Sequence, residues 1–169
     1  FSWLGSFLIS LLLALAGHAF AHNLDTSYAR VTITPQEVEF KFAYDLASLQ
    51  RITQLDTNED LQVSRAELEA ATPGIEQFLR AHVFLRLNEH EAEFAEASPP
   101  VWPEDAGATI PESDYHQRLL SFTFRNPVLA APEAVTLTFD VFGRLGEAHT
   151  ILGVFLWEGR EDEVIFTRF

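Results

Sequence analysis

The chain contains no cysteine, and this absence removes several kinds of chemistry at once. Disulfide bonds, thiolate zinc sites and cysteine nucleophiles are all excluded. Basic residues are also scarce, since 11 Lys and Arg stand against 25 Asp and Glu and give a formal net charge of −14. A surface this acidic repels the phosphates of nucleic acids and attracts cations. We therefore expect no nucleic-acid partner, and a fold held by apolar packing to which a bound metal ion could add stability.

Recognisable catalytic motifs are lacking too. The sequence has no G-x-S-x-G, no H-E-x-x-H and no Gly-rich phosphate loop, the motifs that place a nucleophile, a catalytic zinc ion or a nucleotide phosphate. Asp and Glu are plentiful, but charges spread along strand faces are usually only solvated. We therefore predict that the protein is not an enzyme.

Long apolar runs are confined to the start of the chain. Residues 7–16 form one, and Ala19-Phe20-Ala21 follows with the small-x-small pattern that signal peptidase requires. The run is short for a membrane span, which needs roughly 20 apolar residues. A cleaved signal peptide over residues 1–21 is therefore favoured over an uncleaved anchor. We expect an exported, periplasmic or otherwise extracytoplasmic domain over residues 22–169.

Alternation of apolar and polar residues dominates the rest of the chain. In residues 37–44, Phe40 and Phe42 share one face and charged residues share the other, which is the period-2 pattern of a half-buried strand. Pro35-Gln36 supplies a turn back to a strand over residues 27–34. Further strands are predicted over residues 83–87, 91–95, 118–124, 135–142, 150–157 and 164–168. Short strands joined by turns predict a mainly β fold, an antiparallel, immunoglobulin-like β-sandwich.

Two segments with helical spacing interrupt this pattern. Apolar residues recur three apart in residues 45–55 and at helical spacings in residues 64–82, which predicts two helices. Thr72-Pro73-Gly74 is expected to break the second helix, because proline costs about 3 kcal/mol in a helix interior. The Pro-rich stretch over residues 98–113 is typical of a long loop. We predict a helix–loop–helix inserted into the β domain at about residues 45–82.

The twelve residues that link these helices, Asp56 to Glu67, match the register of an EF-hand calcium loop. Calcium takes about six to eight oxygen ligands, and a tight loop can supply them from alternate residues. The predicted ligands are Asp56, Asn58 and Asp60 through side-chain oxygens, Gln62 through its backbone carbonyl, Ser64 directly or through a water, and Glu67 as a bidentate carboxylate. Val63 at position 8 is apolar, as expected of the residue that packs the loop onto the domain.

One position departs from the EF-hand pattern, because Leu61 stands where the turn usually has glycine. A residue other than glycine in the left-handed backbone region costs roughly 1 kcal/mol, and the chain has no second EF-hand loop. We therefore predict a single weak calcium site with a dissociation constant on the order of 10⁻⁴ to 10⁻³ M. The alternative is a vestigial loop in a domain used only for interaction.

A second alternative concerns histidine. Cleavage of the signal peptide would make His22 the amino terminus, where its α-amine and ring nitrogen could bind copper or nickel with a second histidine. His82, His90, His116 and His149 show no ligand spacing, and ordinary polar histidines are the plainer interpretation. A periplasmic copper- or nickel-binding module that uses His22 is the alternative function.

Three features together resemble the exported N-terminal region of bacterial HupE/UreJ-type membrane proteins. A signal segment ends before His22 and the sequence NLDTSY follows it, an EF-hand-like loop lies within a β-rich domain, and an acidic turn joins strands over residues 151–157 and 164–167. The resemblance implies that the chain is the front portion of a metal-permease or accessory protein, and that its partner is its own C-terminal membrane segment. It assigns no transport residue to this chain, since the transport residues of nickel-associated relatives lie in the membrane helices.

Overall fold

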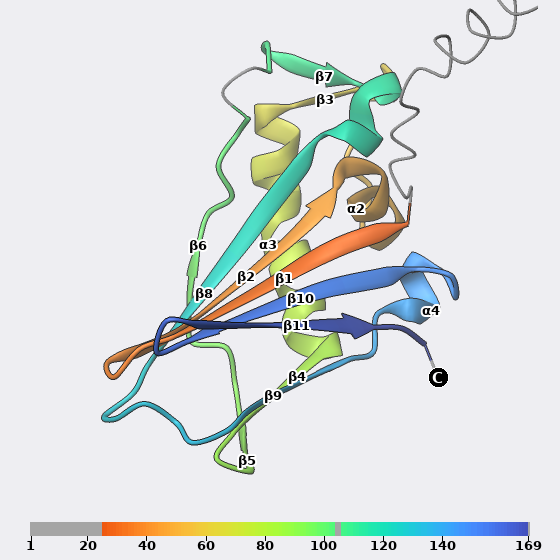
Figure 1. Ribbon diagram of the computed structural model, residues 1–169. Coiled ribbons are helices and arrows are strands. Elements are labelled where there is room, and N and C mark those ends of the chain that lie inside the picture. Colours follow the sequence, from red (N-terminus) through yellow and green to blue (C-terminus); the bar gives the residue numbers. More distant parts are fainter. Residues whose placement is uncertain (1–24, 104–105, 169) are drawn as a thin grey trace, which may run out of the picture.

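The computed structural model describes residues 25–103 and 106–168 (Figure 1). The predicted signal peptide over residues 1–21 and the candidate ligand His22 lie outside the described residues. Among the residues that are described, no helix is both long and apolar enough to cross a lipid bilayer.

A six-stranded sheet forms the centre of the fold, with the strand order β11-β10-β1-β2-β8-β6. Its strands are β1 (Thr26–Ile33), β2 (Glu37–Asp45), β6 (Glu96–Ser98), β8 (Leu119–Pro127), β10 (Thr150–Trp157) and β11 (Arg160–Phe166). The predicted turn at Pro35-Gln36 joins β1 to β2, which pair as an antiparallel hairpin. Phe40 and Phe42 are buried while Lys41 between them is exposed, so the alternation predicted for this strand is confirmed.

The sheet is mixed, and the prediction of a purely antiparallel fold is wrong in this respect. Strands β1 and β10 run parallel, with Thr26 beside Thr150 and Ile33 beside Trp157. Alternation along a strand reports which of its faces is buried, but it carries no information about the direction of the neighbouring strand. The broader prediction of a mainly β fold is confirmed.

A second sheet has three strands in the order β5-β4-β9. They are β4 (Val83–Leu87), β5 (His90–Ala92) and β9 (Val135–Phe139). Strand β9 ends earlier than predicted because the chain turns into the short helix α4 (Phe142–Leu145), which buries Phe142 and Leu145. The last strand, β11, begins four residues before the predicted start at residue 164.

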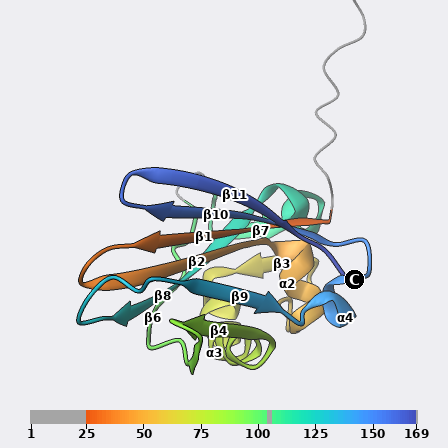
Figure 2. The same ribbon diagram turned by 60° about the horizontal axis from the view of Figure 1, so that its bottom comes forward.

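Two helices flank the predicted loop, as the sequence indicates. Helix α2 (Leu46–Ile52) is capped by Asp45, whose carboxylate accepts the N–H of Ser48. Helix α3 (Arg65–His82) is continuous, so the expected break at Pro73 is wrong. Pro73 lies on the exposed side of α3, where water can hydrate the carbonyl that proline leaves unbonded. Helix α3 and the three-stranded sheet lie on the same side of the six-stranded sheet (Figures 1 and 2).

Aromatic side chains fill the space between these layers. Phe94, which follows β5, makes edge contacts with Phe40 and Phe42 at centroid distances of 5.2 and 5.5 Å. The Phe124 ring packs against Phe94 at a centroid distance of 5.0 Å, with the two rings tilted by 38°. Such ring pairs add about 0.5–1.5 kcal/mol each beyond the area they bury. The β domain therefore has a dense core that contains no charged group from the predicted loop.

The Pro-rich stretch contains regular structure that the sequence does not reveal. Strand β7 (Thr109–Pro111) lies within it and pairs with β3 (Gln62–Ser64) in a separate two-stranded sheet. The 3₁₀ helix η1 (Glu112–Gln117) follows β7 directly. This segment holds the predicted calcium loop at one end of the molecule (Figure 1).

Candidate metal-binding loop

The loop from Asp56 to Glu67 leaves the end of α2 and leads through β3 into the first turn of α3. Strand β7 anchors its second half, because Val63 pairs with Ile110 and both side chains are fully buried. The backbone N–H of Glu112 also donates to the carbonyl of Leu61 at 2.9 Å. The predicted role of Val63 in packing the loop onto the domain is therefore confirmed.

Asp56 is the buried centre of the loop, with 9% of its surface exposed. Its Oδ1 accepts the backbone N–H of Asp60 at 3.2 Å, and its Oδ2 accepts the N–H of Leu61 at 2.8 Å. A buried carboxylate that accepts backbone N–H groups in this way bends the chain around itself. The remaining lone pairs of Asp56 are free to face a cation.

Asn58 and Asp60 continue the same turn. The Oδ1 of Asn58 accepts the N–H of Asp60 at 3.0 Å, and the Oδ1 of Asp60 accepts the N–H of Gln62 at 3.0 Å. Each is a side chain that bonds to its own backbone two residues on, which is a local turn of the Asx type. The amide of Asn58 also donates to Asp60 Oδ2 at 3.1 Å. The three predicted side-chain ligands therefore belong to one connected network.

Leu61 adopts the backbone conformation that the EF-hand register requires of its position. Its φ is +64°, and Glu59 has a φ of +61°. The left-handed region is strained for a residue with a Cβ atom, and Leu61 has 64% of its surface exposed, so burial of its side chain does not offset that strain. The Asp56 carboxylate, which bonds to the N–H of Leu61, holds it there.

Glu67 closes the loop by bridging its two ends. Its Oε2 accepts the N–H and the hydroxyl of Ser64 at 2.9 and 2.8 Å, and its Oε1 accepts the N–H and the hydroxyl of Thr57 at 3.0 and 3.1 Å. The Ser64 hydroxyl caps the N–H of Glu67 in return, which completes a capping box at the start of α3. The hydrogen bonds from Ser64 are the main cause that lowers the pKa of Glu67 to about 2. Glu67 is therefore ionised throughout the physiological range.

The six predicted ligand residues lie in one loop, but their carboxylates do not converge on one point. Among residues 25–103 and 106–168, no group of three or more His, Cys, Asp or Glu side chains has the arrangement of a metal site. The Glu67 carboxylate is directed to Thr57 and Ser64, and the Gln62 side chain accepts the Thr109 hydroxyl at 2.6 Å. Binding of a cation would require Glu67 to exchange hydrogen bonds for the metal.

Tyr115 on η1 is a neighbour of the loop that no pattern in the sequence singles out. It is 4% exposed, and its hydroxyl has no hydrogen-bond partner among the described residues. Burial first, and then the charges of Asp56 and Glu112, raise its pKa to about 12. Tyr115 and Asp56 line a small cavity of about 200 Å³ beside the loop. No motif could have identified this residue, because it reaches the loop through the pairing of β3 with β7.

The histidines considered as partners of His22 have ordinary surroundings. His149 is 1% exposed, and its Nε2 lies 2.9 Å from the hydroxyl of Ser27, also buried. Burial lowers the pKa of His149, and the charge of Arg51 adds to this. His116 lies 3.4 Å from the Asp45 carboxylate, and His82 lies 3.7 Å from Asp140. Each of these three histidines thus has a separate local contact.

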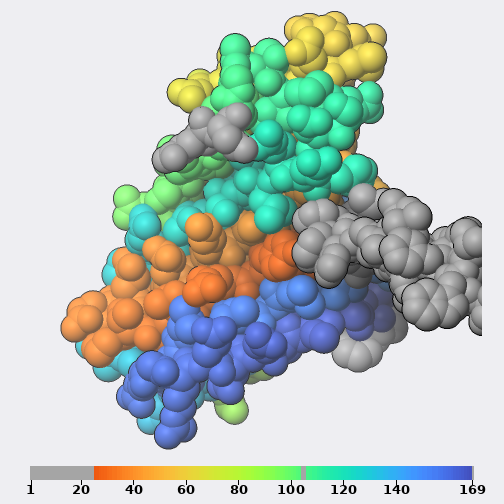
Figure 3. All heavy atoms as spheres, turned by 45° about the horizontal axis from the view of Figure 1, so that its top comes forward, coloured from red at the N-terminus to blue at the C-terminus, as the bar shows by residue number. Residues whose placement is uncertain are grey.

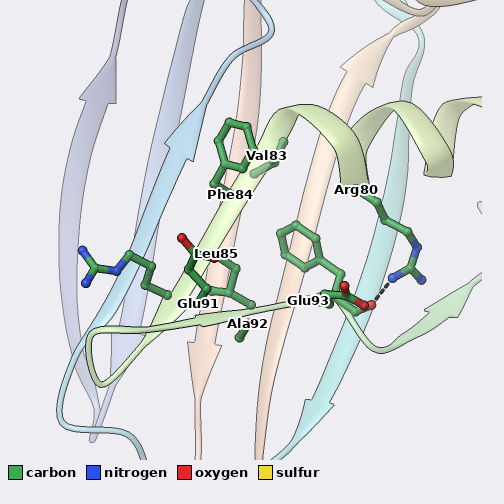
Figure 4. Close-up of a pocket in the computed structure, with 9 residues that line it drawn as sticks. Arg80, Val83, Phe84, Leu85, Glu91, Ala92 and Glu93 are labelled. Atoms are coloured by element: carbon green, nitrogen blue, oxygen red, sulfur yellow. Dashed lines mark hydrogen bonds between the residues drawn. The ribbon is translucent and has the colours of Figure 1, made fainter.

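A larger hollow of about 630 Å³ lies beside β4 and β5 (Figure 4). Its most prominent charged residue, Arg80, donates to the carbonyl oxygens of Phe94 and Ala95, and its guanidinium also lies 4.9 Å from the ring centroid of Phe124. Arg80 therefore ties α3 to the segment after β5. Because the guanidinium of Arg80 already donates to carbonyl oxygens of the protein itself, the hollow is a weaker candidate for a binding site than the loop.

No protein-family model and no curated protein matches the sequence of this chain.

Proposed function

We propose that the protein is a calcium-binding module with a single weak site in the loop from Asp56 to Glu67. The observation that carries the proposal is the conformation of Leu61. A leucine with 64% of its surface exposed stands at a φ of +64°, and the Asp56 carboxylate holds its N–H at 2.8 Å. A loop that retains a strained turn at the one position where the EF-hand register needs it has the backbone of a calcium loop.

The charges around the loop also support a cation. Asp56, Asp60 and Glu67 bring three carboxylates into twelve residues, and neither Arg nor Lys forms an ion pair with any of them among the described residues. Calcium would take oxygens from Asp56, Asn58 and Asp60 and from the Gln62 carbonyl, and Ser64 would take part directly or through a water. Glu67 would turn from Thr57 toward the ion.

The exchange of partners by Glu67 explains why binding should be weak. Its carboxylate gives up hydrogen bonds to Thr57 when it turns to the metal, and charge-assisted hydrogen bonds contribute about 1.5–3 kcal/mol each. The loss of these hydrogen bonds makes the net free energy of calcium binding less favourable. A dissociation constant on the order of 10⁻⁴ to 10⁻³ M suits a compartment where calcium is abundant.

The proposal extends to how the two main sheets and the helix–loop–helix are combined in the fold. We infer that the two main sheets form one immunoglobulin-like sandwich, and that residues 45–82, approximately, form an EF-hand-like insertion in it. The support for one sandwich is the contact of Phe42 in β2 with Phe139 in β9, at a centroid distance of 6.0 Å between the two sheets.

The proposed setting is an exported, membrane-tethered protein of the HupE/UreJ type. This setting rests on the signal-like sequence over residues 1–21 and on the sequence resemblance to HupE/UreJ-type proteins. Neither argument depends on the geometry of the loop. In that setting calcium would stabilise the face of the domain that carries α2, β3, β7 and η1, and the partner would be the membrane segment of the same protein.

Thermal unfolding tests the calcium proposal. The purified domain, residues 22–169, is heated in EDTA and in calcium up to several millimolar, together with a Glu67→Gln variant and a Glu59→Gln variant. Both changes remove one charge from the same loop, but only Glu67 is at a ligand position, and glutamine keeps the capping box with Ser64. Calcium should raise the midpoint of the original chain and of Glu59→Gln by stabilising the folded state, and it should fail to raise that of Glu67→Gln.

Two outcomes would contradict the proposal. An unchanged midpoint at several millimolar calcium would indicate a vestigial loop, and an equal response of Glu59→Gln and Glu67→Gln would indicate non-specific screening of acidic charge. Copper and nickel, added in parallel, test the alternative module that uses His22. A response to copper that is lost when one residue is added before His22 would favour that alternative.

A further inference from the structure

The six-stranded sheet has one covered face and one open face. Helix α3 and the three-stranded sheet lie against the covered face, and in the described chain no helix lies over the other face of β1, β10 and β11 (Figures 1 and 3). The open face nevertheless carries large apolar side chains. Tyr28, Leu119, Leu152 and Ile165 are 43, 47, 36 and 67% exposed.

Strand register places three of these side chains, those of Tyr28, Leu152 and Ile165, in a single band across the sheet, and Leu119 lies two residues away along β8 from Ser121, the partner of Ala43. Ala43 is paired with Tyr28, Tyr28 with Leu152, and Leu152 with Ile165. The band therefore crosses β2, β1, β10 and β11 at one level, and it lines a shallow groove of about 560 Å³. A contiguous apolar band on an acidic domain marks a contact surface.

The next row of the same face carries charges of both signs. Lys41 is paired with Arg30, Arg30 with Val154, and Val154 with Glu163. Like charges directly opposite one another are unfavourable, yet neither Arg30 nor Lys41 forms an ion pair among the described residues. Lys41 is also the only lysine in the sequence. Glu163, at the far end of the row, likewise has no ion-pair partner in the described chain.

We propose that the open face binds a second copy of this chain, face to face, around a two-fold axis that runs parallel to the strands between β1 and β10. Such a rotation leaves the position of every residue along the strand direction unchanged, and it reverses the order of the strands across the sheet. Strand β11 of the second copy then lies over β2 of the first, and β10 lies over β1. Sheets that pack face to face keep their strands within about 30° of one another, so the levels remain matched near the axis.

This arrangement pairs the open face with itself in both rows. In the charged row, Glu163 of the second copy faces Lys41, and the long side chain of Arg30 can reach the same carboxylate. In the apolar row, the protruding Ile165 of the second copy faces the small Ala43. The two-fold axis repeats each contact, as an isologous interface requires.

Charge balance favours this occupant despite the net charge of −14. A third row, Glu39, Thr32, Leu156 and Glu161, brings Glu161 of the second copy toward Glu39. Glu39 is already paired with Arg125, whose Nη2 lies 3.0 Å from its carboxylate and whose Nε lies 3.9 Å from Glu37. The open face is therefore close to neutral, and an acidic domain can bring two such faces together without the repulsion that its other surfaces would cause.

Charge reversal and charge exchange test this dimer. Sedimentation equilibrium on the purified chain should show a monomer–dimer equilibrium. Lys41→Glu and Glu163→Lys should each weaken the dimer at least tenfold, because each places like charges in contact twice. An equimolar mixture of the two single variants should form a heterodimer about as tight as the original dimer, since both pairs again have opposite charges.

Matched controls keep the result interpretable. Arg144→Glu reverses an exposed cation on α4 that does not line the groove, and it should leave association unchanged. Circular dichroism should show that all variants fold. A monomer at every concentration up to several hundred micromolar, or a mixture of Lys41→Glu and Glu163→Lys that fails to associate, would overturn the proposal. A monomer that binds anionic lipid vesicles and loses this binding in Lys41→Glu would also overturn it, in favour of a lipid surface.

Discussion

The aromatic core and the acidic loop are held together by opposite means. Around Phe42, rings from β2, β8 and the segment after β5 pack at 5.0 to 6.0 Å without any charged partner from the loop. Around Asp56, carboxylate and amide oxygens accept the N–H groups of their own backbone, and the apolar contribution is confined mainly to Val63. The core therefore needs no ion to form. The loop is already folded by hydrogen bonds, and a metal ion would have to displace those that Glu67 makes with Thr57.

Truncation of the core should have the largest effect. Phe42→Ala removes a fully buried ring, and this should lower the free energy of unfolding by about 3–5 kcal/mol, with or without calcium. Urea denaturation followed by circular dichroism measures the change. Phe84→Ala, at a phenylalanine that is 52% exposed, is the matched control and should change stability by no more than about 0.5 kcal/mol. Equal losses in the two variants would show that the core is misplaced.

Removal of the carboxylate at the centre of the loop should have a smaller effect on stability. Asp56→Ala leaves the N–H groups of Asp60 and Leu61 without their acceptor, which should lower the free energy of unfolding by about 2 kcal/mol and abolish any response to calcium. Asp56→Asn keeps one acceptor oxygen and should lose about half as much. If Asp56→Ala were as stable as the original chain, the hydrogen bonds that define the loop would not exist in solution.

Relief of backbone strain should have a still smaller effect, of opposite sign. Leu61→Gly removes the Cβ atom from a residue at a φ of +64° and should raise the free energy of unfolding by about 1 kcal/mol even in EDTA. Leu61→Ala, which keeps the Cβ atom, is the control and should give no gain. Destabilisation by Leu61→Gly would mean that this turn is not left-handed.

The smallest expected effect comes from the pH dependence of a single buried histidine. Burial lowers the pKa of His149 from 6.5 in the folded state, against the opposing charges of Asp25 and Asp45 and with the help of Arg51. The unfolded chain therefore binds a proton more readily, so stability is complete above pH 6.5 and falls as the pH decreases toward the folded-state pKa. Denaturation between pH 7.5 and 5, above the titration of Glu67, should show this slope in the original chain and in His90→Gln. His149→Gln should remove it, and a slope that persists in this variant would assign it to other groups.

Much of the sheet could be predicted because each strand carries its own signal. Alternation located β1, β2 and β4 almost to the residue, a continuous apolar run located β10, and the turn at Pro35-Gln36 was correctly placed. The parallel pairing of β1 with β10 could not be predicted, since these strands are joined through most of the domain and nothing local encodes their relative direction. The continuity of α3 through Pro73 depends on which side of the helix faces water, and only the assembled fold determines that.

The loop shows the same division between local and distant information. Its turn and its capping box at Ser64 follow from residues within twelve positions of one another. The anchoring strand β7 and the buried Tyr115 come from a stretch that read as an irregular loop. Prolines at both ends of that stretch concealed a strand of three residues, which is too short to produce a period-2 signal.

The most direct test of the calcium proposal is a calcium titration followed through backbone amide chemical shifts. The N–H groups of Asp60, Leu61 and Gln62 bond to the predicted ligand side chains, so they report any cation that those side chains bind. We predict that these three signals move together and saturate with a dissociation constant on the order of 10⁻⁴ to 10⁻³ M, while the amide of Phe42 in the core does not move. If the loop signals stay fixed at about 10 mM calcium, well above the weakest range of such loops, the loop does not bind calcium and the central claim is wrong.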